Sequence, residues 1–207
     1  MRKETLLKIM GLFRKNIDEG LTILEISKKL KIGYRPAYNH IKSMSEEGII
    51  NIKEVGKAKQ CFLNLRNERC RHILEEVDML RKEELFSKNV KLKNVLENLV
   101  SNLIERFASE IHSIILFGSY AKGKAIKSSD VDLLFVVTDM KNRGLRADIE
   151  RECASFLYSH NIGVSPVITD INEFRKMSQT EKLNVGKEAR MYGIPIYGFE
   201  QFWRQIT

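Results

Sequence analysis

Residues 114–137 read IILFGSYAKGKAIKSSDVDLLFVV, and this stretch decides the fold of the larger part of the chain. It contains two apolar runs, Ile114–Phe117 and Leu133–Val137, of the kind found in strands that are buried inside a sheet. Between the runs lie a glycine–serine pair, three lysines and two aspartates spaced two residues apart. The stretch therefore predicts two buried strands joined by a polar segment that carries chemistry.

The polar segment holds the residue types that bind a metal–phosphate group. Asp130 and Asp132 are two residues apart, so on a strand both carboxylates face one side, where Mg²⁺ would offset their mutual repulsion. Gly118 permits close approach of the backbone, and Ser119 with nearby N–H groups supplies donors for phosphate oxygens. The further candidates for nucleotide binding are Lys122, Lys124 and Ser129. Metal-assisted phosphoryl or nucleotidyl transfer requires this combination.

The spaced pattern Gly118-Ser119-x-Ala121-x-Gly123-x5-Ser129-Asp130-x-Asp132-Leu133 resembles the DNA polymerase β-like nucleotidyltransferases, especially the minimal, MNT-type domains. The resemblance covers about residues 90–207 and includes the ending at residues 193–198, Gly-Ile-Pro-Ile-Tyr-Gly. It implies a mixed sheet flanked by helices that binds a nucleoside triphosphate with two Mg²⁺ ions. By the same resemblance, Asp130 and Asp132 are the metal ligands, and Gly118 and Ser119 hold the β- and γ-phosphates.

One position departs from the family pattern. Active members usually carry a third carboxylate on a later strand, which in this chain is the segment 162–168, after a predicted helix at residues 142–160. Ser165 stands where the acid is expected, and Pro166 favours an edge strand. Asp170 lies beyond the strand and replaces the acid only if the backbone curls back. Without this acid the second Mg²⁺ loses a ligand, so nucleotide binding is expected to survive while turnover weakens. Catalysis is still the leading prediction.

The net charge of +8 is concentrated in residues 1–66, which hold fourteen Lys and Arg against seven Asp and Glu. Such asymmetry suggests a polyanionic partner for this part of the chain. The alternative is a solvated surface that happens to be basic.

The order of elements in residues 1–66 resembles a winged helix-turn-helix domain that binds double-stranded DNA. Apolar spacing predicts a helix at residues 3–15, a second helix capped by Thr22 and Glu25, and a third after a turn at residues 31–33 that ends at Gly48. A hairpin follows, with strands at 49–52 and 61–65 and a polar tip at Glu54–Gln60. The candidate DNA contacts are Tyr34, Arg35, Tyr38, Asn39 and Lys42 on the third helix, and Lys53, Lys57 and Lys59 in the hairpin. Protein contacts are the alternative role of this region.

The predicted organisation is α+β: a winged helix-turn-helix domain at residues 1–66, a helical connector at 67–90 and a nucleotidyltransferase-like domain at 91–207. The connector carries Ile73, Val77 and Leu80 on one stripe, which is spaced either for a homodimer seam or for packing within the chain. Residues 91–107 predict a helix whose wide apolar face covers the sheet.

Composition narrows the function classes further. No apolar run approaches the roughly 20 residues of a membrane helix, so a cytoplasmic protein is expected. Three cysteines without a CxxC pair indicate neither a disulfide framework nor a zinc site. The leading hypothesis is a DNA-binding protein whose second domain transfers a nucleoside monophosphate to a hydroxyl of a protein, RNA or small molecule. The alternatives are a nucleotide-sensing transcriptional regulator with weakened catalysis and an antitoxin-like protein.

Overall fold

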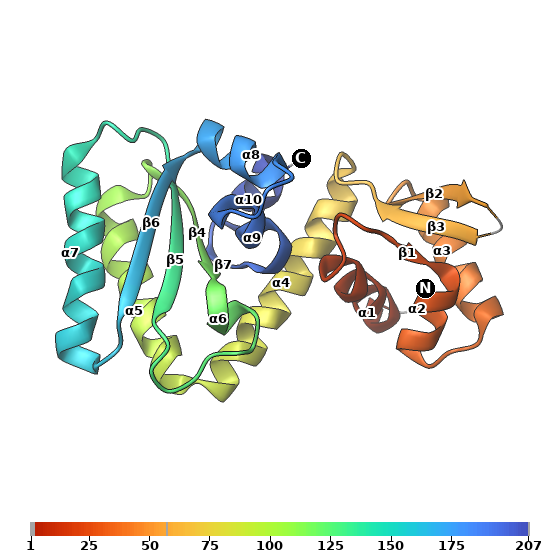
Figure 1. The fold of residues 1–207 in the computed structure, drawn as a ribbon, viewed down its shortest axis with the longest axis horizontal. Helices are drawn as coiled ribbons and strands as arrows, with labels where there is room; N and C mark the ends of the chain where they lie inside the picture. Colours follow the sequence, from red (N-terminus) through yellow and green to blue (C-terminus); the bar gives the residue numbers. More distant parts are fainter. Residues whose placement is uncertain (1–2, 57, 207) are drawn as a thin grey trace. The chain divides into compact units, whose positions relative to one another are not determined.

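The computed structural model describes residues 3–56 and 58–206, and this part of the chain forms two compact units (Figure 1). The division falls between Val77 and Asp78, inside helix α4 (Glu68–Lys88). This helix spans most of the segment predicted as a connector. None of the helices in the described ranges is long and apolar enough to cross a membrane.

The first unit consists of three helices and a small antiparallel sheet, followed by the first part of α4. Its sheet has the strand order β1-β3-β2. The elements before α4 are α1 (Lys3–Arg14), β1 (Leu21–Thr22), α2 (Ile23–Leu30), α3 (Tyr34–Glu46), β2 (Ile50–Val55) and β3 (Ala58–Leu63).

The helices of this unit form where apolar spacing and capping residues favour them. Thr22 caps α2: its Oγ accepts a hydrogen bond from the backbone N–H of Glu25 at 3.2 Å, and the Glu25 carboxylate accepts one from the Thr22 N–H at 2.7 Å. The predicted inner face of α3 is confirmed, since Ala37, Ile41 and Met44 are fully buried. The core of the unit is thus built from positions that sequence periodicity identifies.

The hairpin differs from the prediction. The ladder between β2 and β3 extends to the pair Val55–Ala58, so the long polar tip expected at Glu54–Gln60 is mostly strand. Strand β2 ends at Val55 and β3 begins at Ala58, and Gly56 between them has φ +59°. Positive φ suits glycine in a tight hairpin turn, which lets charged residues remain in the ladder beside it. The sheet also contains β1, which the sequence did not predict.

Most of the apolar stripe predicted on α4 is buried. Ile73 and Val77 are almost fully buried within the first unit, whereas Leu80 is 49% exposed. Packing within the chain therefore accounts for Ile73 and Val77, and a homodimer through this helix stays a prediction.

The second unit contains a four-stranded mixed sheet with the order β6-β5-β4-β7. Strand β4 pairs antiparallel with β5 and β7, and β5 pairs parallel with β6. The elements are α5 (Val90–Phe107), β4 (Ile111–Phe117), α6 (Gly118–Ala121), β5 (Val131–Val137), α7 (Arg143–His160), β6 (Val164–Asp170), α8 (Ile171–Gln179), α9 (Val185–Tyr192), β7 (Ile194–Tyr197) and α10 (Phe199–Gln205). The predicted α+β class with a mixed sheet is confirmed, and β6 is an edge strand as Pro166 suggested.

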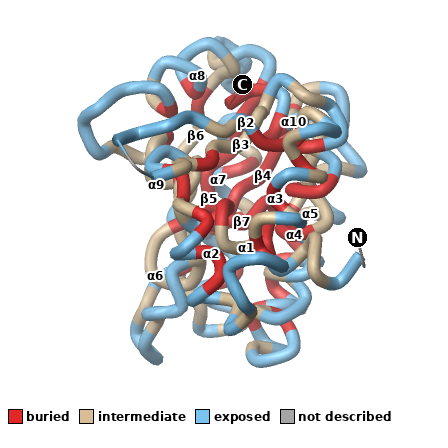
Figure 2. The backbone as a smooth tube through the Cα atoms, turned by 90° about the vertical axis from the view of Figure 1, so that its right-hand side faces the viewer, coloured by how far each residue is buried: buried red, intermediate tan, exposed pale blue. Residues whose placement is uncertain are grey.

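Helices cover both faces of this sheet. Figure 1 shows α5 and α7 on one side and α8, α9 and α10 on the other. The central strands β4 and β5 are accordingly buried almost along their whole length (Figure 2). The predicted apolar face of α5 lies in the core through Leu92, Val95, Leu96, Leu99 and Leu103. This packing fixes the ends of β4 and β5, from which the polar segment projects.

Candidate nucleotide-binding site

The turn after β4 brings backbone and carboxylate into contact. Gly118 has φ +68°, and a Cβ built on it would lie 2.0 Å from Oδ2 of Asp132. A side chain at residue 118 would therefore be strained and would also displace the carboxylate. Asp132 lies on β5, opposite Phe117 in the ladder with β4, so the sheet itself places the acid beside the turn.

Residues 118–124 fold into a compact loop. The backbone N–H of Lys122 donates to the Gly118 carbonyl at 3.2 Å, and that of Lys124 donates to the Ser119 carbonyl at 2.9 Å. Gly123 closes the loop with φ +66°. The loop thus starts at Gly118 beside Asp132, and phosphate binding by Gly118 and Ser119 stays a prediction.

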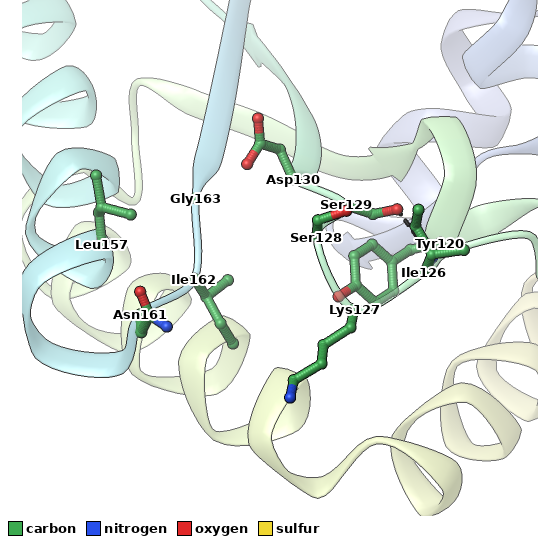
Figure 3. Close-up of a pocket in the computed structure, with 10 residues that line it drawn as sticks. All are labelled: Tyr120, Ile126, Lys127, Ser128, Ser129, Asp130, Leu157, Asn161, Ile162 and Gly163. Atoms are coloured by element: carbon green, nitrogen blue, oxygen red, sulfur yellow. Dashed lines mark hydrogen bonds between the residues drawn. The ribbon is translucent and has the colours of Figure 1, made fainter.

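Asp130 contacts a different glycine. A Cβ on Gly163, just before β6, would lie 2.1 Å from Oδ1 of Asp130. Asp130 also lines a cavity of about 570 Å³, which Figure 3 shows between the loop before β5 and the end of α7. The lining residues are Tyr120, Ile126, Lys127, Ser128, Ser129, Asp130, Leu157, Asn161, Ile162 and Gly163. Asp132 thus lies beside the turn at Gly118 and Asp130 beside Gly163 and the cavity, and the two are near enough for the charge of Asp130 to raise the pKa of Asp132.

Ser129 supports the loop between the strands. Its Oγ accepts a hydrogen bond from the backbone N–H of Ile126 at 2.9 Å, which closes the turn before Asp130 (Figure 3). Of the lysines, Lys127 lines the cavity, and Lys124 belongs to the exposed part of the loop. The structure thus brings Ser129 and Asp130 to the cavity and Gly118 to Asp132.

The site accumulates negative charge around Asp132. Partial burial raises the pKa of Asp132, and the charges of Asp130 and Glu188 raise it further, while Lys122 lowers it. A carboxylate whose ionised form is disfavoured in this way gains from a bound cation. The arrangement is therefore suited to a cation as ligand.

Glu188 is a site residue that the sequence reasoning missed. It lies on α9, and its Oε1 is 2.6 Å from Nζ of Lys122. The same ammonium lies 5.3 Å from the centroid of the Tyr192 ring, also on α9. Glu188 and Tyr192 are four residues apart, which places them on one face of the helix. The four-residue spacing of Glu188 and Tyr192 is visible in the sequence, but no sequence pattern links these two residues to Lys122.

The third carboxylate of the family pattern is absent from the expected place. Ser165 is the register partner of Asp132 in the parallel pairing of β5 with β6. Asp170 pairs with Val137 at the other end of the strand, and its side chain caps α8 by accepting from the Glu173 N–H at 2.9 Å. The backbone therefore does not curl back, and Asp170 does not replace the missing acid.

Magnesium fits the donors that are present. Across the described ranges, no three His, Cys, Asp or Glu side chains are grouped closely enough to hold a metal ion by themselves. Mg²⁺ is often bound by one or two carboxylates, with substrate phosphates and water completing its coordination. Asp130 and Asp132 supply hard oxygen ligands of this kind, so the chain suits one Mg²⁺ that arrives with a nucleotide.

The residues expected to contact DNA lie on the first unit. Tyr34, Arg35, Asn39 and Lys42 are exposed on α3, and Tyr38 is half-buried. The ammonium of Lys59 lies 5.3 Å from the Tyr38 ring centroid, so the hairpin and α3 meet at this point. Lys53 lies over the Phe62 ring at 5.4 Å. Lys57 lies outside the described residues.

Lys53 and Lys59, the two described lysines of the hairpin, lie on opposite faces of the sheet. In the β2–β3 ladder Lys53 pairs with Gln60 and Lys59 pairs with Glu54, so the lysines project from opposite faces. Lys59 faces α3, while Lys53 shares a face with Phe62. The ladder thus places Lys53 and Lys59 on strands rather than in a polar tip, and their contact with DNA stays a prediction.

Comparison with known proteins agrees with the site in the second unit. Residues 96–190 match the family profile of the nucleotidyltransferase domain. This part of the chain, somewhat less than half of its length, is thus similar to nucleotidyltransferase domains. The matched range contains the Gly118–Asp132 segment, β6 and most of α9, so the described site lies within the domain.

Two similar proteins come from Methanocaldococcus jannaschii, and both are named as proposed protein adenylyltransferases. One is 36% identical over 81 residues, which are 38% of this chain and 55% of that protein. The other is 23% identical over 107 residues, which are 52% of this chain and 100% of that protein. The chain thus spans about half the length of the first relative.

Solved structures similar to about half of this chain include toxin–antitoxin proteins. One is a complex with AMP-PNP, at 18% identity and a TM-score of 0.35, covering 53% of this chain and 82% of that one. Another is a mutant of the toxin–antitoxin MntA–HpeT, at 14% identity and a TM-score of 0.35, covering 53% and 83%.

Proposed function

We propose that the second unit binds Mg²⁺ with a nucleoside triphosphate and transfers the nucleoside monophosphate to a hydroxyl group. The observation that carries the proposal is the contact of two carboxylates with two glycines, Asp132 with Gly118 and Asp130 with Gly163. This arrangement leaves backbone and carboxylate oxygens close together beside a loop with exposed polar groups. Triphosphate binding requires such a place.

In the proposed reaction, the acceptor oxygen forms a bond to the α-phosphorus, and the bond from that phosphorus to the β-phosphate oxygen breaks. Pyrophosphate leaves, and the hydroxyl proton passes to solvent or a base. Gly118 and Ser119 hold the terminal phosphates, with Lys124 and Ser129 nearby, while Asp130 and Asp132 hold the cation. Bound Mg²⁺ supplies charge neutralisation on the phosphate oxygens.

The names of the Methanocaldococcus relatives support ATP as the nucleotide and a protein as the acceptor. An RNA or small-molecule hydroxyl is the alternative acceptor. Because Ser165 replaces the expected acid, the alternative for the whole protein is a nucleotide sensor or an antitoxin-like protein that binds nucleotide without turnover.

The test is transfer of label from α-³²P-labelled ATP, CTP, GTP and UTP in the presence of Mg²⁺. The full chain is incubated with cell protein or RNA, beside the double variant Asp130→Asn/Asp132→Asn. Labelling of an acceptor by the wild type alone supports the enzyme. Metal-dependent binding without labelling supports the sensor instead.

For the first unit, we propose a winged helix-turn-helix that binds double-stranded DNA and thereby places or regulates the transferase. The contact between Lys59 and Tyr38 favours this second function, because it joins the hairpin to a helix with exposed arginine and asparagine side chains. The test is binding of the full chain to duplex DNA, which must weaken steeply as salt rises. Binding that is absent at low salt contradicts it.

A further inference from the structure

The ammonium of Lys122 is already engaged by α9. Its ion pair with Glu188 is 2.6 Å long, and the two side chains are only 31% and 20% exposed. The same ammonium also contacts the Tyr192 ring, whose centroid lies 5.3 Å away. Partly buried charge pairs are screened less by salt than surface pairs, so this contact fixes the loop more firmly than an exposed pair would.

Helix α9 is in turn held at its C-terminal end. Arg81 of α4 donates to the carbonyl oxygens of Tyr192 at 2.8 Å and Gly193 at 3.0 Å. The guanidinium also pairs with the fully buried Asp78 at 2.6 Å. A cation at a helix C-terminus satisfies carbonyl groups that the helix leaves without partners and favours the helix dipole. The end of α9 that carries Tyr192 is thus held by Arg81, another residue of the second unit.

We propose that Lys122 is a positioning residue, anchored by Glu188 and Tyr192, and that this anchor holds the Gly118–Lys124 loop in the form that binds nucleotide. The proposal rests on the proposed function and adds a specific role for α9. The N–H groups of Lys122, Gly123 and Lys124 all donate backbone hydrogen bonds within the loop, so a fixed Lys122 side chain also fixes the turn around Gly118.

The opposite role, a direct phosphate ligand, makes a different prediction for Glu188→Gln. This variant keeps the size of the side chain but removes its charge. If Lys122 bound phosphate directly, release of its ammonium from Glu188 would strengthen binding of the triphosphate. If Lys122 is an anchor, the same variant loosens the loop and weakens binding.

The first experiment measures hydrogen–deuterium exchange of the 118–124 amides in the full chain without nucleotide. Exchange is expected to be at least about threefold faster in Glu188→Gln and Lys122→Met than in the wild type. The matched control is Glu150→Gln, which breaks an exposed ion pair with Arg146 on α7. Tyr192→Leu is a milder variant, and Tyr192→Phe retains the ring. Unchanged exchange in Glu188→Gln, Lys122→Met and Tyr192→Leu overturns the anchor.

The second experiment measures the dissociation constant of Mg²⁺ with a non-hydrolysable ATP analogue. Glu188→Gln, Lys122→Met and the double variant are each expected to bind about fivefold more weakly, with no further loss in the double variant. Tighter binding by Glu188→Gln overturns the positioning role. A wild type that binds no nucleotide contradicts the proposed function instead, and the exchange measurement then still decides whether the anchor exists.

Discussion

The carboxylate of Asp130 lies against the backbone of Gly163, where any Cβ would lie 2.1 Å from Oδ1. No positive φ is required at this glycine, so its role is to leave room for the acid. Asp132 has the same relationship with Gly118, on a different element. The two aspartates of the family pattern are therefore each paired with a glycine that the folded sheet brings to them.

Gly163→Ala is expected to displace the Asp130 carboxylate and to weaken binding of Mg²⁺ with an ATP analogue by at least about tenfold, the change that corresponds to about 1.4 kcal/mol. Isothermal titration calorimetry measures the effect. Gly144→Ala on α7 is the control, because its added Cβ would meet only the Asn142 side chain at an ordinary 3.4 Å. Equal affinities of the two variants would refute the role given to Gly163.

Gly118→Ala and Gly123→Ala separate backbone strain from contact with the acid. Both glycines have positive φ, +68° and +66°, so each variant is expected to lose about 1 kcal/mol of folding stability. Only Gly118→Ala places a Cβ on the Asp132 carboxylate, since nothing lies within 4 Å of a Cβ at residue 123. Denaturant unfolding measures the loss of stability in both variants, and calorimetry measures nucleotide binding. We expect Gly118→Ala to lose nucleotide binding and Gly123→Ala to keep it.

Asp132→Asn is expected to stabilise the fold while abolishing metal-dependent nucleotide binding. The pKa of Asp132 is raised in the folded state, so the folded protein holds this proton more tightly than the unfolded chain. Stability from this group is therefore present at low pH and is lost as pH rises from the unfolded pKa to above the folded one. At neutral pH the variant should show a melting temperature higher by on the order of 2 °C, and a lower one would contradict the pKa shift.

Ser165→Asp is expected to restore the third carboxylate. Ser165 is the register partner of Asp132 on the neighbouring parallel strand, so a carboxylate there lies beside the first two. The affinity for Mg²⁺ in the presence of nucleotide should rise about tenfold, and label transfer should increase. The control is Ser155→Asp, the same change at an exposed position of α7. If the two variants behave alike, Ser165 does not occupy the missing ligand position.

For DNA binding, Lys53→Ala and Lys59→Ala together are expected to reduce the slope of log affinity against log salt by about 2, one unit for each lost phosphate contact. Arg35→Ala or Asn39→Ala should instead relax sequence preference with little change in slope. Lys8→Ala removes a lysine that is paired with Glu4 on α1 and serves as the control. An unchanged slope in the double variant would count against the hairpin as a DNA contact.

Sequence reasoning located the strands, the loop and the two aspartates because each depends on local pattern. The buried runs of β4 and β5 and the apolar face of α5 were predicted from periodicity alone. The hairpin was predicted with too long a tip, because charged residues such as Glu54 and Lys59 resemble a loop although the ladder accommodates them.

What the sequence could not provide is contact between distant segments. Gly163 meets Asp130, and Glu188 meets Lys122, only after β6 and α9 have packed onto the sheet. Neither residue belongs to a local motif, so periodicity and spacing give no reason to single them out. The family pattern points to β6 for the third acid, and no local signal links the loop to Glu188 on α9.

The central claim is that Asp130 and Asp132 form a Mg²⁺–nucleotide site, and calorimetric titration of the full chain with a non-hydrolysable ATP analogue tests it most directly. The titration is run with Mg²⁺ and again with excess EDTA, for the wild type and for Asp130→Asn/Asp132→Asn. The account predicts binding only by the wild type and only with Mg²⁺. Equal binding by the double variant, or by the wild type in EDTA, would contradict it.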